Sequence, residues 1–367
     1  MEVDDNVFAT TYTEAREKFL AAAAGLPHQA HRCPAAGMDD EPLTMDVVRL
    51  GADEAANVLL ITSACHGVEG FCGSGVQVAL LRDATFREQA RHAGVAVVMV
   101  HALNPWGFSH WRRVTQEGVD LNRNFIDFTR PLPHNRGYDD IADALVPPHW
   151  PPSPAEEASL RHYEQQHGTR KLREAVSGGQ FHHPDGLFYG GTAPTWSHRT
   201  LRVALWQHAA RAERLAWIDI HTGLGPSGVG ERIFAGPDDD RALHRAKAWW
   251  GPRVTSLHDG SASSPDLHGM MWHAAAQECP RTEITGMALE FGTWPLHTTT
   301  LALRGDHWAA CHPEAPAPVR GALRAAMHEA FFVDTPAWKH AVLQQGHEAA
   351  VQAIEGLAGR PRSHLVD

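Results

Sequence analysis

Short runs of apolar residues alternate along the chain with stretches in which apolar positions recur at helical spacing. Four apolar runs, rich in Val, Leu and Ile, predict buried strands at 58–62, 95–100, 215–220 and 284–291. The stretch 74–92, between the first two runs, has helical spacing and ends before a glycine. The order strand, helix, strand is typical of a parallel sheet whose faces are covered by helices.

Further helices are predicted before and after this unit. The first begins after Thr11, which forms a capping-box pattern with Glu14. The expected helices cover 13–24, 154–167, 198–211 and most of 313–357. The fold class that follows is α/β, with a mixed, largely parallel twisted sheet and helices on both faces.

The chain carries no sign of a boundary between domains. No linker rich in Gly, Ser or charged residues divides it, so we expect a single domain over residues 1–367. Seven prolines lie between positions 131 and 154. This density predicts an irregular, Pro-rich insertion at about 130–155.

Composition and charge exclude several classes of protein. Of 367 residues, 43% are hydrophobic and 20% charged, as in globular proteins, and the net charge of −11 argues against a nucleic-acid partner. The apolar runs are far shorter than a bilayer span, so no membrane association is expected. The acidic N-terminus lacks the positive region of a signal peptide, and five cysteines indicate reduced thiols. We therefore expect a cytoplasmic protein.

A candidate pair of metal ligands follows the first predicted strand. His66 and Glu69 form an H-x-x-E pair in a Gly-punctuated loop, and imidazole and carboxylate are both ligands for Zn²⁺. Taken alone, such a pair is more often a chance pattern than a metal site. Cys65 and Cys72 flank the pair, and we interpret both as packing residues, because Cys65 precedes His66 in an extended segment and points to the opposite face.

Three arginines cluster after the second predicted strand. Arg112, Arg113 and Arg123 place their guanidinium groups within twelve positions of a chain that is acidic overall. Such groups bind carboxylates through two parallel hydrogen bonds and stabilise a developing oxyanion. The alternative is a solvated cluster that pairs with Glu117 and Asp120.

The order of these motifs is similar to that of a known family. The run G-V-D-L-N-R-N-F at 118–125 follows H-x-x-E and N-P-x-G, and this combination resembles the zinc carboxypeptidase (M14-type) superfamily. The combination looks closest to the bacterial branch with the domain of unknown function DUF2817. That branch also resembles the succinylglutamate desuccinylases and aspartoacylases. The matched elements extend from about Leu59 to Pro295, and the resemblance implies a zinc carboxypeptidase-like fold.

The resemblance assigns roles to residues of the arginine cluster. It implies that Asn122 and Arg123 hold the terminal carboxylate of the substrate. It implies that one of Arg112 and Arg113 polarises the scissile carbonyl: the preceding Trp favours Arg112, and the spacing in the deacylase relatives favours Arg113. Asp120 matches a carboxylate that orients the first histidine ligand.

The third predicted strand ends in D-x-H. His221 completes a His-Glu-His set for one zinc ion and leaves a fourth coordination position for water, as catalytic zinc sites do. Asp219 lies two residues earlier, on the same face of the strand, where it supports the site. Without the H-x-x-E pair, a core histidine at a strand end would be the better interpretation.

The fourth predicted strand carries one carboxylate, Glu290, near its end. A lone buried acid is costly unless it is paired or functional. Glu290 matches the glutamate general base of the family, which takes a proton from the attacking water and passes it to the leaving amine. The alternative is a structural acid that pairs with a nearby arginine.

One residue of the family pattern is missing. Digestive-type carboxypeptidases have a tyrosine between the third zinc ligand and the general base, but this chain has no tyrosine after His221. Tyr189 lies in a glycine-rich loop, 186–192, that either borders the site or packs in the core. The difference weakens the expectation of ordinary peptide carboxypeptidase activity and leaves the zinc chemistry untouched.

The hypothesis that follows is a zinc-dependent hydrolase, an M14-like metallocarboxypeptidase, that cleaves an amide bond next to a free carboxylate. The first alternative is an N-acyl amino acid deacylase of the desuccinylase or aspartoacylase type. The second is a zinc-binding protein without turnover. The expected partner is a small peptide or an acylated amino acid.

Overall fold

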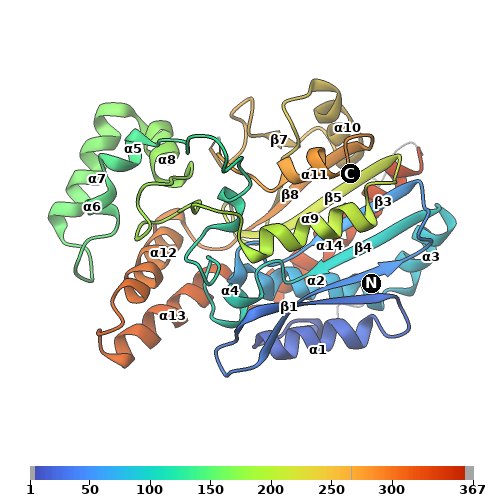
Figure 1. The fold of residues 1–367 in the computed structure, drawn as a ribbon, viewed down its shortest axis with the longest axis horizontal. Coiled ribbons are helices and arrows are strands. Elements are labelled where there is room, and N and C mark those ends of the chain that lie inside the picture. The colour runs from blue at the N-terminus through green and yellow to red at the C-terminus, as the bar shows by residue number, and fades with distance from the viewer. Residues whose placement is uncertain (1–4, 266, 360–367) are drawn as a thin grey trace.

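The computed structural model describes residues 5–265 and 267–359, and its centre is one eight-stranded sheet (Figure 1). The strands are β1 (His28–Ala36), β2 (Pro42–Leu50), β3 (Asn57–Thr62), β4 (Val95–His101), β5 (Arg214–Gly223), β6 (Gly230–Phe234), β7 (Thr255–Ser256) and β8 (Glu283–Gly292). They lie in the order β1-β2-β4-β3-β5-β8-β6-β7. The four neighbours β4, β3, β5 and β8 run parallel, whereas the pairs β1–β2, β2–β4 and β6–β8 are antiparallel. The expected mixed, largely parallel sheet is confirmed.

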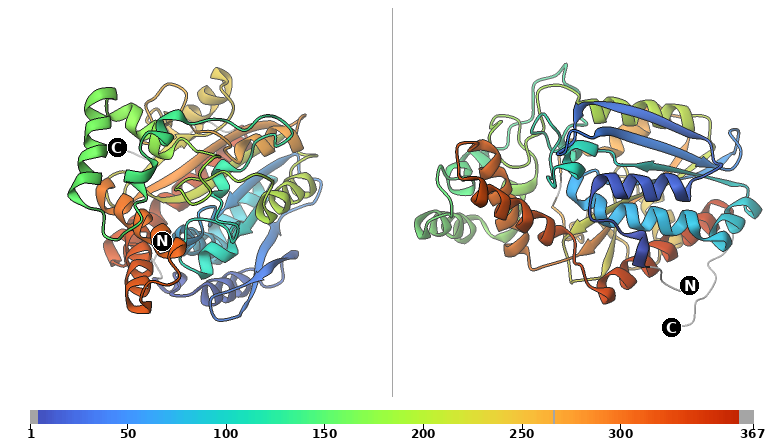
Figure 2. Two further views of the ribbon diagram at one scale, coloured as in Figure 1. Left: turned by 60° about the vertical axis from the view of Figure 1, so that its left-hand side comes forward. Right: turned by 90° about the horizontal axis from the view of Figure 1, so that it is seen from below.

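The sheet separates two apolar clusters because successive side chains of a strand point to opposite faces. In β3, Leu59 and Ile61 belong to one cluster, and Val58 and Leu60 belong to the other. Helices cover both faces, as the view from below in Figure 2 shows. The first cluster packs against α1 (Tyr12–Ala22), α2 (Gly70–Arg82), α3 (Ala84–His92), α10 (Asp240–Trp250) and α14 (Pro336–Leu357), and the second against α9 (Trp196–His208) and α11 (Trp272–Glu278).

Two helical regions differ in detail from the sequence-based expectation. At the start of α1, the Thr11 hydroxyl accepts a hydrogen bond from the backbone N–H of Glu14, but the Glu14 carboxylate accepts from the N–H of Thr10 instead of Thr11. The helix expected over 74–92 is two helices, α2 and α3. They separate at Asp83, whose carboxylate accepts from the N–H groups of the first turn of α3 and so caps a new helix.

The hairpin of β1 and β2 has no counterpart in the sequence-based expectation. β1 lies at the edge of the sheet, most of its residues are exposed or half-buried, and it contains Pro34. Its register with β2 shifts between Arg32 and Ala36. An edge strand of this kind needs no apolar run, so the hydrophobic pattern that reveals central strands does not reveal it.

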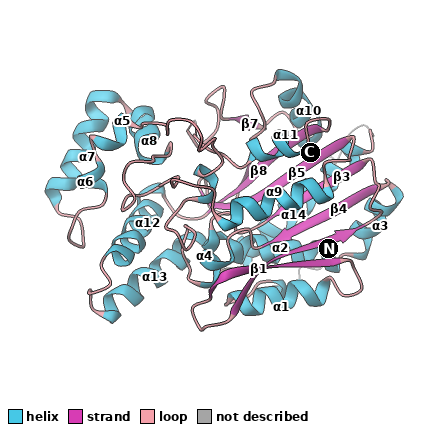
Figure 3. Ribbon diagram, in the orientation of Figure 1, coloured by secondary structure: helices cyan, strands magenta, loops and turns pink. Residues whose placement is uncertain are grey.

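The Pro-rich segment leads into a group of helices beyond the carboxyl ends of the parallel strands. It forms two one-turn helices, α5 (Arg136–Asp139) and α6 (Ala142–Leu145), and continues into α7 (Pro154–His167) and α8 (Thr169–Ser177). These four helices lie on the left in Figure 1, near α12 (Leu296–Cys311) and α13 (Ala317–Phe331). Figure 3 shows that long loops fill the space between this group and the sheet. None of the described helices has the length and apolar character needed to cross a bilayer.

Candidate metal centre and cavity

Three side chains of the predicted ligand set converge where β3 and β5 end. His66 and Glu69 lie in the short turn after β3, which includes the 3-10 helix η2 (Gly67–Glu69), and His221 lies near the end of β5. The Nδ1 atoms of His66 and His221 lie 3.0 Å from the two carboxylate oxygens of Glu69 and 3.2 Å from each other. All three residues are buried, and each offers one ligand atom that lies within 4.8 Å of the ligand atoms of the other two. This geometry suits a single metal ion.

The other ring nitrogen of each histidine faces a carboxylate. His221 Nε2 pairs with Asp219, and His66 Nε2 lies 3.4 Å from Asp120 Oδ1. At His221, a carboxylate that accepts from Nε2–H leaves the lone pair of Nδ1 directed at the other ligands, which is the usual arrangement around a metal-bound imidazole. The donor set therefore fits Zn²⁺, with two imidazoles and one carboxylate.

The charges of the cluster reinforce one another. Burial alone would raise the pKa of the Glu69 carboxyl, but His66 and His221 outweigh burial and hold that pKa below its usual range. Burial alone would lower the pKa of His221, but Asp219 and Glu69 raise it well above the usual value. A buried carboxylate flanked by imidazoles is a strong site for positive charge.

A close backbone approach orients the ligand turn. A Cβ atom on Gly67 would lie 2.2 Å from the carbonyl carbon of Gly107 and 2.3 Å from the Arg112 carbonyl oxygen, so only glycine fits. The Asn104 side chain accepts from the N–H of Gly107 and donates to the carbonyls of Arg113 and Val114. The N-P-x-G motif therefore holds the loop that carries the arginines against the loop that carries His66 and Glu69.

The structure separates the two adjacent arginines. The Arg113 guanidinium donates to Asp120 at 2.9 Å and to Glu69 Oε1 at 3.3 Å, and its Nη2 lies 2.8 Å from His66 Nε2. Arg112 instead pairs with Asp306 of α12 at 3.0 Å and does not line the cavity. Of the two candidate arginines, only Arg113 has a side chain that reaches the candidate ligand cluster.

The D-L-N-R run borders the same cavity. Asp120 is fully buried, and Arg113 and Arg123 hold its pKa well below the usual range although burial opposes this. The Asn122 amide oxygen accepts from the backbone N–H of Met271 at 3.0 Å. Burial lowers the pKa of Arg123 to about 10, and its guanidinium donates to the carbonyls of Ser177 and Asn122.

Glu290 lies on β8 directly opposite His221 of β5. One carboxylate oxygen accepts from the backbone N–H of Leu224 at 2.9 Å, and the side chain lines the cavity together with His66, Glu69 and Arg113. Burial, followed by the charge of Glu69, raises the pKa of Glu290 to about 7. No arginine forms an ion pair with Glu290 among the described residues, so the structural-acid alternative finds no partner.

The glycine-rich loop borders the cavity through a neighbour of Tyr189. Phe188 lines the cavity in a left-handed conformation with φ +55°, and its ring lies within 6 Å of the guanidinium carbons of Arg113 and Arg123. Tyr189 is buried, and its backbone carbonyl accepts from the N–H of Asp120. The described residues that line the cavity include no tyrosine.

Cys65 and Cys72 lie in the two apolar clusters on opposite faces of the sheet. Both are buried, and neither contributes to the group of ligand atoms around Glu69. Their positions agree with the interpretation that both cysteines are packing residues and not metal ligands.

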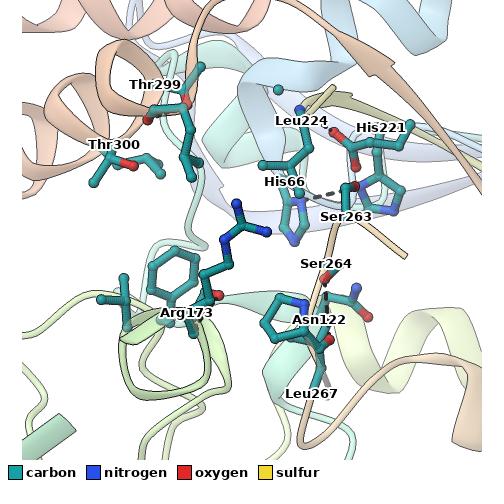
Figure 4. Close-up of a pocket in the computed structure, with 18 of the residues that line it drawn as sticks. His66, Asn122, Arg173, His221, Leu224, Ser263, Ser264, Leu267, Thr299 and Thr300 are labelled. Atoms are coloured by element: carbon teal, nitrogen blue, oxygen red, sulfur yellow. Dashed lines mark hydrogen bonds between the residues drawn. The ribbon is translucent and has the colours of Figure 1, made fainter. Parts of the chain in front are cut away.

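The cavity has a volume of about 490 Å³ and opens between the strand ends and the outer helices. Figure 4 shows His66 and His221 on one side, Thr299 and Thr300 of α12 on another, and Arg173 of α8 directed into the space. Leucine side chains from α7, α8 and α12 line much of the outer wall, at Leu160, Leu172 and Leu303. Sequence reasoning missed the two threonines, Arg173 and these leucines, because no motif marks them.

Solved structures with similar arrangements include the carboxypeptidase A of Helicoverpa armigera, at 13% identity and a TM-score of 0.47, with 93% of this chain and 73% of that chain covered. A metallo-carboxypeptidase of Burkholderia cenocepacia has 16% identity and a TM-score of 0.36, with 90% and 68% covered. An aspartoacylase family protein of Mesorhizobium loti has 16% identity and a TM-score of 0.33, with 73% and 62% covered. No curated protein matches the sequence. Residues 8–345 match the model of a family described as a protein of unknown function, DUF2817.

Proposed function

The chain belongs to the DUF2817 family, and we propose that it is a zinc-dependent hydrolase that cleaves an amide bond next to a free carboxylate. One observation carries this proposal. Two imidazoles and a carboxylate converge at the ends of β3 and β5, and the carboxylate of Glu290 faces the same cavity.

His66, Glu69 and His221 would hold one zinc ion. When bound, zinc would polarise the scissile carbonyl and lower the pKa of a water molecule to about 7. Asp120 and Asp219 would keep the two imidazoles in the orientation that directs Nδ1 at the ion.

Glu290 would act as the general base and acid. It would take a proton from the attacking water and pass that proton to the leaving amine. The N–H of Leu224 restrains one of its oxygens and leaves the second oxygen available to accept a proton.

Arg113 would stabilise the oxyanion that forms on the scissile carbonyl. Its guanidinium is held by Asp120 and Glu69, so it is oriented before the substrate binds. Asn122 and Arg123 would border the free carboxylate of the substrate. Arg112 has no part in this scheme, because its guanidinium pairs with Asp306 outside the cavity.

A deacylase that acts on N-acyl amino acids is the second candidate. The observation that favours it is the absence of a tyrosine among the described residues that line the cavity. The resemblance to digestive-type carboxypeptidases implies a tyrosine that covers the bound peptide. The two candidates use the same catalytic groups and differ only in the acyl half of the substrate.

The test begins with purified protein loaded with zinc and checked by metal analysis, with about one ion per chain expected. A panel then compares dipeptides with N-acetyl and N-succinyl amino acids. Turnover of dipeptides supports the peptidase, and exclusive turnover of the acylated set supports the deacylase. If the zinc-loaded protein hydrolyses no member of a broad amide and ester panel, a zinc-binding protein without turnover becomes the better interpretation.

A further inference from the structure

Arg123 uses part of its hydrogen-bonding capacity to hold helix α8. Its Nε and Nη2 donate to the Ser177 carbonyl at the end of α8, at 3.1 and 2.7 Å, and its Nη1 donates to the Asn122 carbonyl at 2.9 Å. A guanidinium has five N–H groups, so these bonds occupy three of them. Two N–H groups of Arg123, one on Nη1 and one on Nη2, remain for a ligand.

Helix α8 places a third guanidinium at the same cavity, beside those of Arg113 and Arg123. Arg173 lies one turn before Ser177, and the Ser177 hydroxyl donates to the Arg173 carbonyl. Arg173 lines the cavity, and Figure 4 shows its side chain directed inward, toward the side where His66 and His221 lie. Within residues 5–265 and 267–359, no hydrogen bond or ion pair engages the Arg173 guanidinium, whereas Arg170 and Lys171 on the same helix pair with Glu174.

The charges around the cavity leave Arg173 unbalanced. Six charged groups lie at the strand side of the cavity. They are the carboxylates of Glu69, Asp120, Asp219 and Glu290 and the guanidinium groups of Arg113 and Arg123. With a divalent cation bound, the formal charges of these groups cancel. The positive charge of Arg173 is then the surplus, beside half-buried apolar side chains such as Leu160 and Leu172. Arg173 itself is exposed to solvent, so water and salt screen part of its attraction for an anion.

We propose that Arg173 is a further specificity-determining residue, whose guanidinium binds the free carboxylate of the substrate together with Arg123, which also positions helix α8. This inference rests on the proposed function for the identity of the anion. Arg173 presents all five N–H groups, and a guanidinium binds a carboxylate through two parallel hydrogen bonds. An outer helix thus adds a second residue that selects acidic substrates to those of the D-L-N-R run.

The test measures binding separately from turnover. The zinc-loaded protein carries Glu290→Gln, which slows hydrolysis, and is titrated with N-benzoyl-L-phenylalanine and with the corresponding amide, N-benzoyl-L-phenylalaninamide. The two ligands differ in the negative charge of one group. Arg173→Gln and Arg173→Lys are compared in this background, and Arg170→Gln is the matched control, because Arg170 lies on the same helix and does not line the cavity.

Arg173→Gln is expected to raise the Kd for the free acid about tenfold and to change the Kd for the amide less than twofold. Arg173→Lys keeps the charge without the fork and is expected to give an intermediate loss. Arg170→Gln should change neither value more than twofold.

The proposal is overturned if Arg173→Gln weakens both ligands equally, if it weakens neither, or if Arg170→Gln has the same effect. It is also overturned if the parent protein binds the acid no better than the amide or binds neither. Failure of the proposed function is a separate result, because it would appear as missing zinc or missing turnover in the protein with Glu290 intact. Even then, a higher Kd for the free acid but not for the amide in Arg173→Gln would still support the role of Arg173 in binding an anion.

Discussion

The two sides of the cavity are built in opposite ways. On the strand side, His66, Glu69, His221 and Glu290 are buried; the first three contact one another, and Glu290 accepts from the backbone N–H of Leu224. On the helix side, α7 has no buried residue and α8 has one, Ala175. The strand side is therefore closely constrained, and the helix side is open to solvent.

This difference separates the chemistry from the selection of substrate. The strand side is fixed by the hydrogen-bond ladders of β3, β5 and β8 and by apolar clusters on both faces of the sheet. A substitution there leaves a buried charge without its partner, which is expensive. A substitution on the outer wall exposes or removes only a partly solvated side chain. We expect large effects on metal binding and rate from the first side and modest effects on affinity from the second.

The largest effect is expected for Glu69→Gln. The amide removes the negative charge between the two histidines, so the zinc content should fall from about one ion per chain to near zero and hydrolysis should become undetectable. Metal analysis after dialysis measures the first change. Leu172→Ser, on the outer wall, is the control and should retain full zinc content. Normal zinc content in Glu69→Gln would contradict the ligand assignment.

Glu290→Gln should separate rate from metal binding. Loss of the general base is expected to lower kcat about 10²- to 10⁴-fold with zinc content unchanged. Steady-state kinetics on any substrate found in the panel, together with metal analysis, provides the measurement. A kcat within tenfold of the parent would remove Glu290 from the role of base.

The adjacent arginines offer a matched pair. Arg113→Gln should lower kcat about 10²- to 10³-fold, because Arg113 is the guanidinium that reaches the ligand cluster. Arg112→Gln should change kcat only a few-fold, since it loses the ion pair with Asp306 outside the cavity. Thermal unfolding of both variants shows whether the loss reflects the fold, because Arg113→Gln also leaves Asp120 without its partner. Equal losses of kcat in the two variants would show that the geometry does not distinguish them.

Asp219→Asn should weaken zinc binding without abolishing it. Asp219 pairs with His221 Nε2 and also accepts from the Thr62 hydroxyl, so the amide would orient the imidazole less well. Loss of such a supporting carboxylate typically lowers metal affinity about 10- to 100-fold. Competition with a chelator of known affinity measures the change. Unaltered affinity would indicate that the imidazole is held by other contacts.

The smallest effect is expected on the helix side. Leu172→Ser removes an apolar side chain from the outer wall and should raise KM roughly fivefold for substrates with a large apolar group, with kcat unchanged. A KM series over substrates of increasing apolar size tests this expectation. If kcat fell as strongly as in Glu290→Gln, the proposed separation of the two sides would be wrong.

Much of the central architecture could be predicted from the sequence. The four apolar runs coincide with β3, β4, β5 and β8, because a strand buried on both faces needs consecutive apolar residues. The candidate metal ligands follow these runs, since parallel strands bring their carboxyl ends to one edge of the sheet. The edge strand β1 was not predicted, because its mostly exposed polar residues carry no periodic signal. Its neighbour β2 is buried, but Thr44, Asp46 and Arg49 interrupt its apolar residues, so it lacks the continuous apolar run of the other central strands.

The choice between Arg112 and Arg113 could not be made from the sequence. Two neighbours in the chain have the same chemistry and differ only in direction. Trp111, just before them, adopts a left-handed conformation with φ +57°, and the carbonyl of Arg112 accepts from the N–H of Val68. These backbone features direct Arg113 to the ligand cluster and Arg112 to Asp306, and neither can be read from residue types.

The sequence by itself determined the residue types of the candidate site and the strands that carry them, because strand burial and ligand chemistry leave a local pattern. Only the tertiary structure decided which arginine faces the ligands, and it alone brought Arg173 to the cavity. Arg173 follows the D-L-N-R run by about fifty positions, and its place depends on the hydrogen bonds from Arg123 to the end of α8. Contacts between distant segments depend on packing and direction, and these leave no periodicity in a single chain.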